Sequence, residues 1–295
     1  YNAITLPEYF EKKFDDKSGI IRLAASLIIT FFFTFYVAAQ FSGAGKVLNV
    51  TFGMSQIHGM ILGTLIIVFY TLMGGFLAVA WTDMIQGIIM IGTLVILPIV
   101  GWIELSASGS SLNMDWSTLY GGKTGAAGVT AAIGGLSWGL GYMGQPHLVS
   151  RYMAINKVEN ILISRKIAYA WAIPAFIGAM FIGLLGIGLI QQGHLIFEGN
   201  IISTIHDLPD PEKLMPIMAK NLLPGWLAGI FIVGAISAMM STADSQLLVS
   251  TTVLTEDITR KYIQKDSSES QMLLIGRIIT IIIGIIAFYM AWHSE

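Results

Sequence analysis

The sequence predicts an all-α polytopic membrane protein with seven transmembrane helices. Of its 295 residues, 55% are hydrophobic and only 12% are charged, and the mean hydropathy is +0.72. A soluble domain carries about 25% charged residues. A bilayer is crossed by about 17–25 helical residues, and seven apolar segments meet this length. We place them at residues 20–41, 57–80, 84–103, 126–148, 167–190, 222–253 and 272–292.

The composition also excludes several classes of protein. The formal net charge of −2 predicts no nucleic-acid partner, and the absence of cysteine excludes disulfides and thiol catalysis. The five histidines lack ligand spacing, and no phosphate loop, dinucleotide fingerprint or nucleophile elbow occurs, so no enzyme is predicted. The chain begins at Tyr1 without a signal peptide, so we expect an internal piece of a longer protein.

The segments between the spans predict how the chain turns at the membrane surfaces. Residues 1–19 open with Thr5-Leu-Pro-Glu8, a helix-capping pattern, and predict a short amphipathic helix on the membrane face. Trp81-Thr82-Asp83 is expected to form a tight turn between the second and third spans. Residues 104–125 are expected to form a polar extracellular loop.

The distribution of basic residues predicts the orientation. If the spans alternate across the membrane, 12 of the 16 Lys and Arg residues lie on the side of the N-terminus. Basic residues collect on the cytoplasmic side of membrane proteins. The N-terminus of this chain is therefore expected in the cytoplasm. The other side holds only Lys46, Lys123, Lys213 and Lys220.

The sixth span carries a polar stripe within an apolar run. At helical spacing its members share one broad face. A carboxylate near mid-membrane costs about 2.5–3.5 kcal/mol on insertion scales, and several oxygens with about one negative charge suit a small hard cation. The alternative is helix packing, with Ser and Thr bonded to their own i−4 carbonyls, and both interpretations stay open. The stripe consists of Ser237, Ala238, Ser241, Thr242, Asp244 and Ser245.

The fourth span is rich in glycine and closes on Pro146. Such a segment predicts an interrupted helix, and broken helices at mid-membrane often form transporter binding sites. Trp138 and Tyr142 are four residues apart and would present two rings on one face, with Gln145 as a polar group for a small solute. The alternative is an interfacial aromatic belt or glycine-mediated packing.

Two further polar residues have ordinary explanations. Asp83 in a first helical turn would interact favourably with the helix dipole. Tyr36 lies among apolar residues of the first span, where core packing is the default.

Four motifs stand out in order along the chain. They are Tyr1-Asn-Ala-Ile-Thr-Leu-Pro-Glu-Tyr-Phe, Gly74-Gly-Phe-Leu-Ala-Val-Ala-Trp-Thr-Asp83, Trp138-Gly-Leu-Gly-Tyr-Met-Gly-Gln-Pro-His147 and Met240-Ser-Thr-Ala-Asp-Ser-Gln-Leu-Leu248. Together they resemble the sodium:solute symporter family, and the Trp138-x-x-x-Tyr142-x-x-x-Pro146 spacing favours its proline-transporting branch. The resemblance implies sodium as a co-transported ion, L-proline as the solute and a place in the cell membrane.

The resemblance implies a five-plus-five inverted-repeat transporter core. Residues 20–103 would be the last three helices of the first repeat, and residues 126–292 the first four helices of the second. The family's discontinuous first core helix and its last core helix are not in this chain. Its partners would therefore be membrane lipid, a small solute and these missing upstream and downstream helices.

The resemblance also implies particular site residues. The main sodium site would use the Ala238 carbonyl and the Ser241 and Thr242 hydroxyls. A second sodium site would involve Asp83, Ser241, Asp244 and Ser245. Substrate-site residues would be Trp138, Tyr142, Pro146 and Tyr36, to which the residue pattern of the fourth span adds Gln145.

Three other functions fit parts of the sequence. The solute could be another small organic molecule, or the chain could be a symporter-like sensor domain of a signalling protein. An intramembrane aspartyl enzyme would need the Asp83 and Asp244 carboxylates to face each other.

Overall fold

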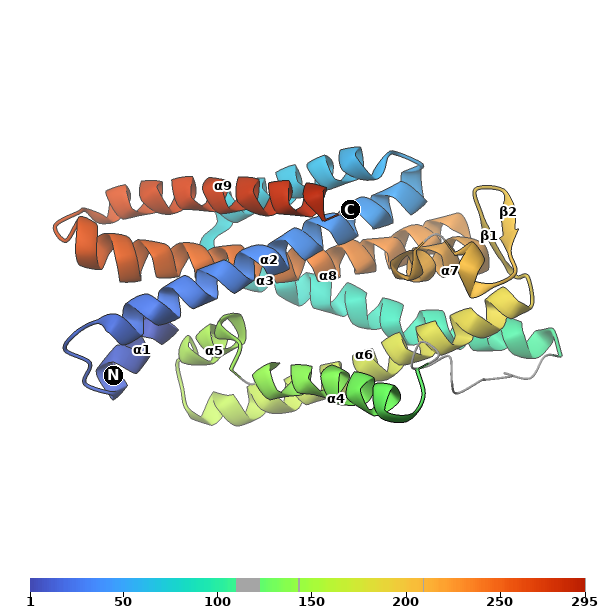
Figure 1. The fold of residues 1–295 in the computed structure, drawn as a ribbon, viewed down its shortest axis with the longest axis horizontal. Coiled ribbons are helices and arrows are strands. Elements are labelled where there is room, and N and C mark those ends of the chain that lie inside the picture. The colour runs from blue at the N-terminus through green and yellow to red at the C-terminus, as the bar shows by residue number, and fades with distance from the viewer. Residues whose placement is uncertain (110–122, 143, 209, 295) are drawn as a thin grey trace.

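The structure, a computed structural model, describes residues 1–109, 123–142, 144–208 and 210–294 as a bundle of long helices (Figure 1). The long helices are α2 (Ile20–Phe52), α3 (Gln56–Ala107), α6 (Glu159–Gln191), α8 (Gly225–Thr252) and α9 (Glu269–His293). The shorter ones are α1 (Leu6–Lys13), α4 (Gly125–Tyr142), α5 (Pro146–Met153) and α7 (Leu214–Leu222). The 3-10 turns are η2 (Ile205–Asp207) and η3 (Pro211–Lys213), and the π-helical segment η4 (Val253–Ile263) continues α8. An antiparallel hairpin pairs β1 (Leu195–Phe197) with β2 (Asn200–Ile202).

The predicted class of helical membrane protein is confirmed. In the part of the chain that the structure describes, five helical runs are long and apolar enough to cross a membrane. The predicted second and third spans both lie within α3, and the predicted fourth span is divided between α4 and α5. The predicted loop at 104–125 lies mostly outside the described residues, and α3 continues to Ala107. The five runs are Ile20–Phe52, Gln56–Ala107, Glu159–Gln191, Gly225–Ile263 and Glu269–His293.

Helix α3 is broken at Gly75. Its 52 residues would extend about 78 Å if straight, enough for two crossings of a bilayer. Gly75 has φ 59° and ψ −169°, a backbone conformation that only glycine adopts readily. In Figure 1 the two limbs of α3 point in different directions on either side of the break.

The predicted turn at Trp81-Thr82-Asp83 is therefore wrong. These residues are helical, and the Thr82 hydroxyl donates to the carbonyls of Ala78 at 3.0 Å and Val79 at 2.9 Å. The polar side chain of Thr82 is thus satisfied within the helix and does not mark its end. Asp83 lies eight residues beyond the break, so it is not in a first helical turn, and the dipole explanation does not hold.

Helix α8 lies at the centre of the bundle (Figure 1). Its first half supplies Phe231 to a core cluster that includes Leu97 of α3 and Leu189 of α6. Its second half supplies Leu247 to a different cluster that includes Phe41 of α2. The polar stripe predicted on α8 therefore lies where the two clusters meet, surrounded by other helices.

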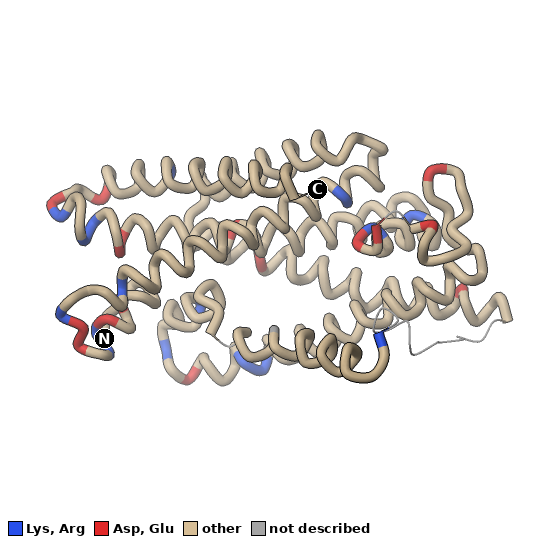
Figure 2. The backbone as a smooth tube through the Cα atoms, in the orientation of Figure 1, with Lys and Arg blue, Asp and Glu red and all other residues tan. Residues whose placement is uncertain are grey.

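Charged residues are concentrated toward the two ends of the bundle, as Figure 2 shows. Between these ends the long helices are almost entirely uncharged along their length. This distribution fits a bilayer around the middle of the bundle, because charges in the hydrocarbon region are costly.

Candidate ion and solute site

The three residues predicted to bind sodium form one cluster on α8. The Ala238 carbonyl accepts hydrogen bonds from the Thr242 hydroxyl at 2.8 Å and from the Ser241 hydroxyl at 3.2 Å. The helix brings them together because positions three and four apart lie on one face. Each hydroxyl uses its proton in this bond, which leaves its oxygen lone pairs available to a cation.

The residues predicted to form a second sodium site lie around the Ser245 hydroxyl. Its oxygen lies 3.1 Å from Oδ1 of Asp244 and 3.4 Å from Oδ2 of Asp83, and it donates to the Ser241 carbonyl at 2.8 Å. The structure therefore brings Asp83, on α3, to Asp244 and Ser245, on α8. Asp244 is fully buried, and Ser245 is nearly so.

Tyr70 accounts for part of the burial of Asp244. Its hydroxyl lies 2.5 Å from Oδ2 of Asp244 and 3.2 Å from the Met240 carbonyl. A buried carboxylate needs such donors, because an unpaired charge in an apolar environment is strongly unfavourable. Sequence reasoning did not identify Tyr70, since a tyrosine in an apolar span resembles a packing residue.

Arg151 of α5 joins this cluster through an ion pair with Asp83. The same guanidinium nitrogen, Nη2, also lies 2.6 Å from the Ser245 hydroxyl oxygen. In the sequence Arg151 counted only as one of the basic residues on the cytoplasmic side. Its partner lies 68 positions earlier in the chain, and no local pattern indicates such a contact.

The predicted helix interruption before Pro146 is confirmed. Helix α4 ends at Tyr142, Gly144 lies in a turn, and α5 begins at Pro146 with Gln145 as its N-cap residue. Proline in a first helical turn lacks only a donor that would be unpaired anyway. The break therefore separates Tyr142, at the end of one helix, from Pro146, at the start of another.

The predicted substrate residues gather around this break only in part. Tyr36 of α2 is partly buried, and Tyr142 at the end of α4 is exposed. The ring of His147 packs edge-on against Phe33 of α2, with centroids 5.6 Å apart, and so ties the start of α5 to α2. The prediction for Trp138 concerns a side chain that lies outside the described residues.

Two adjoining cavities connect these features. A cavity of about 20 Å³, the size of about one water molecule, is lined by Arg151 and Ser245. A larger cavity of about 330 Å³ is lined by Pro146, by residues 3–7 and by residues of α8 and η4. Phe76, which follows the break in α3, lines both cavities. The two cavities thus share a wall, to which Ser150, Leu248 and Val249 also contribute.

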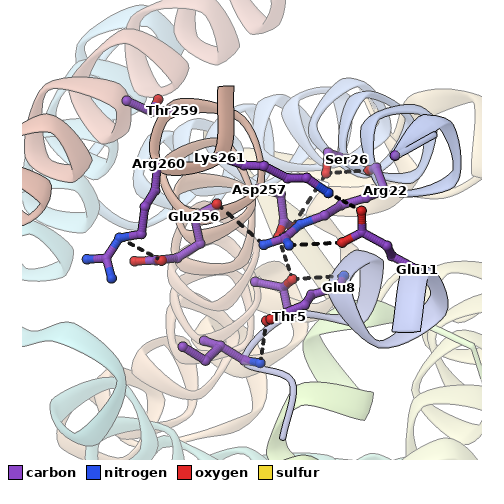
Figure 3. A network of polar contacts seen from close by, with 12 residues as sticks. Thr5, Glu8, Glu11, Arg22, Ser26, Glu256, Asp257, Thr259, Arg260 and Lys261 are labelled. Atoms are coloured by element: carbon purple, nitrogen blue, oxygen red, sulfur yellow. Dashed lines mark hydrogen bonds and ion pairs between the residues drawn. The ribbon is translucent and has the colours of Figure 1, made fainter. Parts of the chain in front are cut away.

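The N-terminal segment is held by a polar network at one end of the bundle (Figure 3). The Thr5 hydroxyl donates to Asp257 of η4 at 2.7 Å, and Arg22 at the start of α2 pairs with the same carboxylate. Glu11 of α1 pairs with both Arg22 and Lys261. The predicted capping at Thr5 is confirmed, because its hydroxyl accepts from the Glu8 amide at 3.2 Å.

The donor set consists of hydroxyls, carbonyls and carboxylates. Among the described residues no group of three or more His, Cys, Asp and Glu could hold a metal ion. Hard monovalent and alkaline-earth cations bind oxygen ligands, and softer metals prefer imidazole or thiolate. The chemistry of the cluster thus fits an alkali cation and not a transition metal.

Comparison with known proteins shows the family. Residues 1–295 match the family model described as "Sodium:solute symporter family". The chain is 35% identical over 300 residues to the "High-affinity proline transporter PutP" of Bacillus subtilis (strain 168), across 100% of this chain and 60% of that protein. The chain belongs to the sodium:solute symporter family. It is also 33% identical over 296 residues to the "Sodium/proline symporter" of Escherichia coli (strain K12), across 100% of this chain and 58% of that protein.

A solved structure shares the fold of this chain. It is that of a Na+-coupled sialic acid symporter in a substrate-bound outward-open state, with a TM-score of 0.76 at 22% identity. The match covers 98% of this chain and 61% of that one. This chain thus spans about 60% of the length of the relatives that it matches and shares the helical transporter fold of the family.

Proposed function

We propose that the full-length protein is a secondary active transporter in which sodium influx drives uptake of L-proline. The observation that carries the proposal is the oxygen cluster of Ala238, Ser241 and Thr242 on α8, next to the buried Asp244 carboxylate. Membership of the family supports sodium as the driving ion. Two relatives that the whole chain matches are named as proline transporters.

The sodium ion would bind the hydroxyl lone pairs that the internal hydrogen bonds of the α8 cluster leave free, and it would compete with the hydroxyl protons for the Ala238 carbonyl. Ala238, Ser241 and Thr242 would contribute three oxygens, and helices outside this chain would contribute the rest. A second ion would use Asp83, Asp244 and Ser245. Because these oxygens come from α3 and α8, an ion there would stabilise one arrangement of the two helices.

The solute would bind at the break between α4 and α5. Tyr36 of α2 and Tyr142 at the end of α4 are two of the proposed contacts. Trp138, Gln145 and Pro146 are the further proposed contacts. Aromatic residues with few polar groups suit a small, partly apolar solute such as proline, because such pockets are mostly apolar with a few placed polar groups.

Coupling would follow from differential affinity. Sodium would favour a conformation in which the α4–α5 break can close on the solute, and the solute would favour the same conformation. Alternating access would expose the site first outside and then to the cytoplasm, where we place residues 1–19. We propose that residues 20–103 and 126–292 belong to the two inverted repeats.

The geometry also opposes the enzyme alternative. Two catalytic carboxylates would need to share a proton, but Asp83 forms an ion pair with Arg151, and the Asp244 carboxylate accepts from Tyr70. In this structure the Arg151 guanidinium thus engages the charge of Asp83.

Sodium dependence of uptake tests the ion site. In the full-length protein, Ser241→Ala and Thr242→Ala should each raise the sodium concentration for half-maximal proline uptake. Thr51→Ala is the matched control, because Thr51 makes the same bond to its own i−4 carbonyl at 2.7 Å on α2. The site assignment is wrong if both α8 variants keep the wild-type sodium dependence.

Competition tests the solute separately. Binding of radiolabelled proline is measured with and without sodium against a panel of small amino acids and betaines. Proline should compete best, and only when sodium is present. If another solute competes and proline does not, the specificity is wrong and the sodium site still stands.

A further inference from the structure

Arg151 lies at the junction of three helices. From α5 its guanidinium contacts Asp83 of α3 and the Ser245 hydroxyl of α8, and Nη1 donates to the His147 carbonyl at 3.3 Å. The side chains of Arg151 and Asp83 are 34% and 17% exposed. The interaction is therefore partly buried, and it is the point at which the short helix α5 is attached to the ion-site cluster.

Three oxygens near this guanidinium lie close enough to the Ser245 hydroxyl oxygen for each to share one small cation with it. The Ser245 hydroxyl oxygen is 3.4 Å from Asp83 Oδ2, 3.1 Å from Asp244 Oδ1 and 2.8 Å from the Ser241 carbonyl. Two ligands at right angles, each about 2.4 Å from a cation, lie about 3.4 Å apart. Nη2 of Arg151 contacts two of these oxygens and so places a positive charge where such a cation would bind.

This cluster differs from an ion pair in which every charge and every acceptor atom has a partner. It holds two carboxylates, Asp83 and Asp244, but one guanidinium, and the buried Oδ1 of Asp83 accepts no hydrogen bond. The cluster therefore has one more carboxylate than guanidinium groups, and a free acceptor oxygen. It can attract a second cation, but that cation and the guanidinium would compete for Asp83 Oδ2 and the Ser245 hydroxyl.

We propose that Arg151 is a tethered cation that occupies the Asp83–Asp244–Ser245 position and is displaced when sodium binds there. The inference rests on the proposed sodium-coupled function and adds a specificity-determining residue to it. Displacement is required because two positive charges at the same oxygens repel each other.

Displacement of Arg151 would also link sodium binding to the large cavity beside Pro146. Helix α5 has only eight residues and follows the break at Gly144. Its Pro146, Ser150 and Met153 line the cavity of about 330 Å³. When Arg151 leaves Asp83, α5 loses its ionic attachment to α3 and can move as a wall of that cavity.

A purely structural ion pair makes a different prediction. If Arg151 only stabilises the fold, its removal lowers thermal stability and leaves sodium affinity unchanged or weaker. If Arg151 competes with sodium, its removal makes sodium bind more tightly. Sodium affinity and its direction of change therefore separate the two roles.

The test uses the full-length transporter in proteoliposomes and measures the half-saturating sodium concentration for proline uptake. Arg151→Gln should lower this concentration about fivefold or more, as expected for a site coupling of ordinary size. Arg151→Lys retains the charge and should stay closer to the wild type. Arg260→Gln is the matched control, because Arg260 pairs with Glu256 and Glu269 on η4 and α9, away from this cluster.

A labelling measurement covers the case in which Arg151→Gln does not fold. Since this chain has no cysteine, Ser150→Cys in a cysteine-free background reports the accessibility of α5 to a maleimide. Sodium, but not potassium, should increase its labelling rate. A folded Arg151→Gln with unchanged or weaker sodium affinity, or a labelling rate that does not respond to sodium, overturns the inference. A wild-type protein with no sodium-stimulated uptake instead overturns the proposed function.

Discussion

The Arg22 guanidinium lies against the Asp257 carboxylate, with Nη2 2.6 Å from Oδ1, and the Asp257 side chain is fully buried. Asp257 also accepts from the Thr5 hydroxyl. The N-terminal segment and the start of α2 thus meet η4, which lies 252 and 235 positions later in the chain, at one carboxylate (Figure 3). This carboxylate holds residues 3–7 in place as one wall of the large cavity.

Loss of Arg22 should strongly destabilise the protein. In Arg22→Gln the buried Asp257 charge loses its cation, a change that costs about 3–5 kcal/mol when the pair is buried. Arg260→Gln removes a partner of pairs in which the arginine is 30% exposed and should cost about 0–1 kcal/mol. Chemical unfolding in detergent measures both. Equal losses in the two variants would show that the Arg22–Asp257 pair has no special role.

Glu11 should make the stability of the polar network between the N-terminal segment, α2 and η4 depend on pH. Burial raises the pKa of the Glu11 carboxyl, but the hydrogen bonds and charges of Lys261 and Arg22 together lower it by more. The pKa of Glu11 therefore lies below the ordinary value. A carboxyl with a lowered pKa stabilises the fold above its unfolded-state pKa and loses this contribution as the pH falls through the folded-state pKa.

Glu11→Gln should therefore be less stable than the wild type at pH 7, and the difference should shrink below about pH 4.3, the usual glutamate pKa. Glu269→Gln is the control, because its side chain is 84% exposed, and its difference should be small at both pH values. Thermal unfolding at a series of pH values measures the effect. A difference for Glu11→Gln that stays constant down to pH 3 would contradict the proposed charge interaction.

Gly178 should be intolerant of a side chain. A Cβ atom there would overlap the backbone carbonyl of Leu94, where α6 crosses α3. Gly178→Ala should cost about 1–3 kcal/mol, because backbone must shift to make room. Gly183 lies on the same helix with open space around it, so Gly183→Ala should be neutral or stabilising by up to about 1 kcal/mol. The ratio of folded to aggregated protein after heating in detergent distinguishes the two.

Gly75 should be intolerant for a conformational reason. Nothing lies within 4 Å of a Cβ added at Gly75 or at Gly92, so crowding does not separate these positions. Only Gly75 has a positive φ, 59°. Gly75→Ala should cost about 1–3 kcal/mol through backbone strain, whereas Gly92→Ala, in a regular part of α3, should be neutral or slightly stabilising. Similar melting temperatures for the two variants would argue against a required break at Gly75.

Local sequence patterns predicted those parts of the site that lie within one element. The cluster of Ala238, Ser241 and Thr242 follows from helical spacing, and the interruption before Pro146 follows from glycine and proline chemistry. The sequence predicted the break in α3 at the wrong place, because the polar residues of Trp81-Thr82-Asp83 are typical of a membrane boundary. The Thr82 hydroxyl is satisfied inside the helix, and Gly75 provides the bend instead.

The sequence by itself determined that this chain forms apolar helices with a hydroxyl and carboxylate stripe on one of them, because composition and periodicity are local properties. Only the tertiary structure decided what stands opposite that stripe. Arg151 reaches Asp83 and Ser245, and Tyr70 reaches Asp244, across 68, 94 and 174 positions of the chain. Such pairs form because helices distant in sequence pack together, and a buried carboxylate is stable only where that packing brings it a donor or a cation.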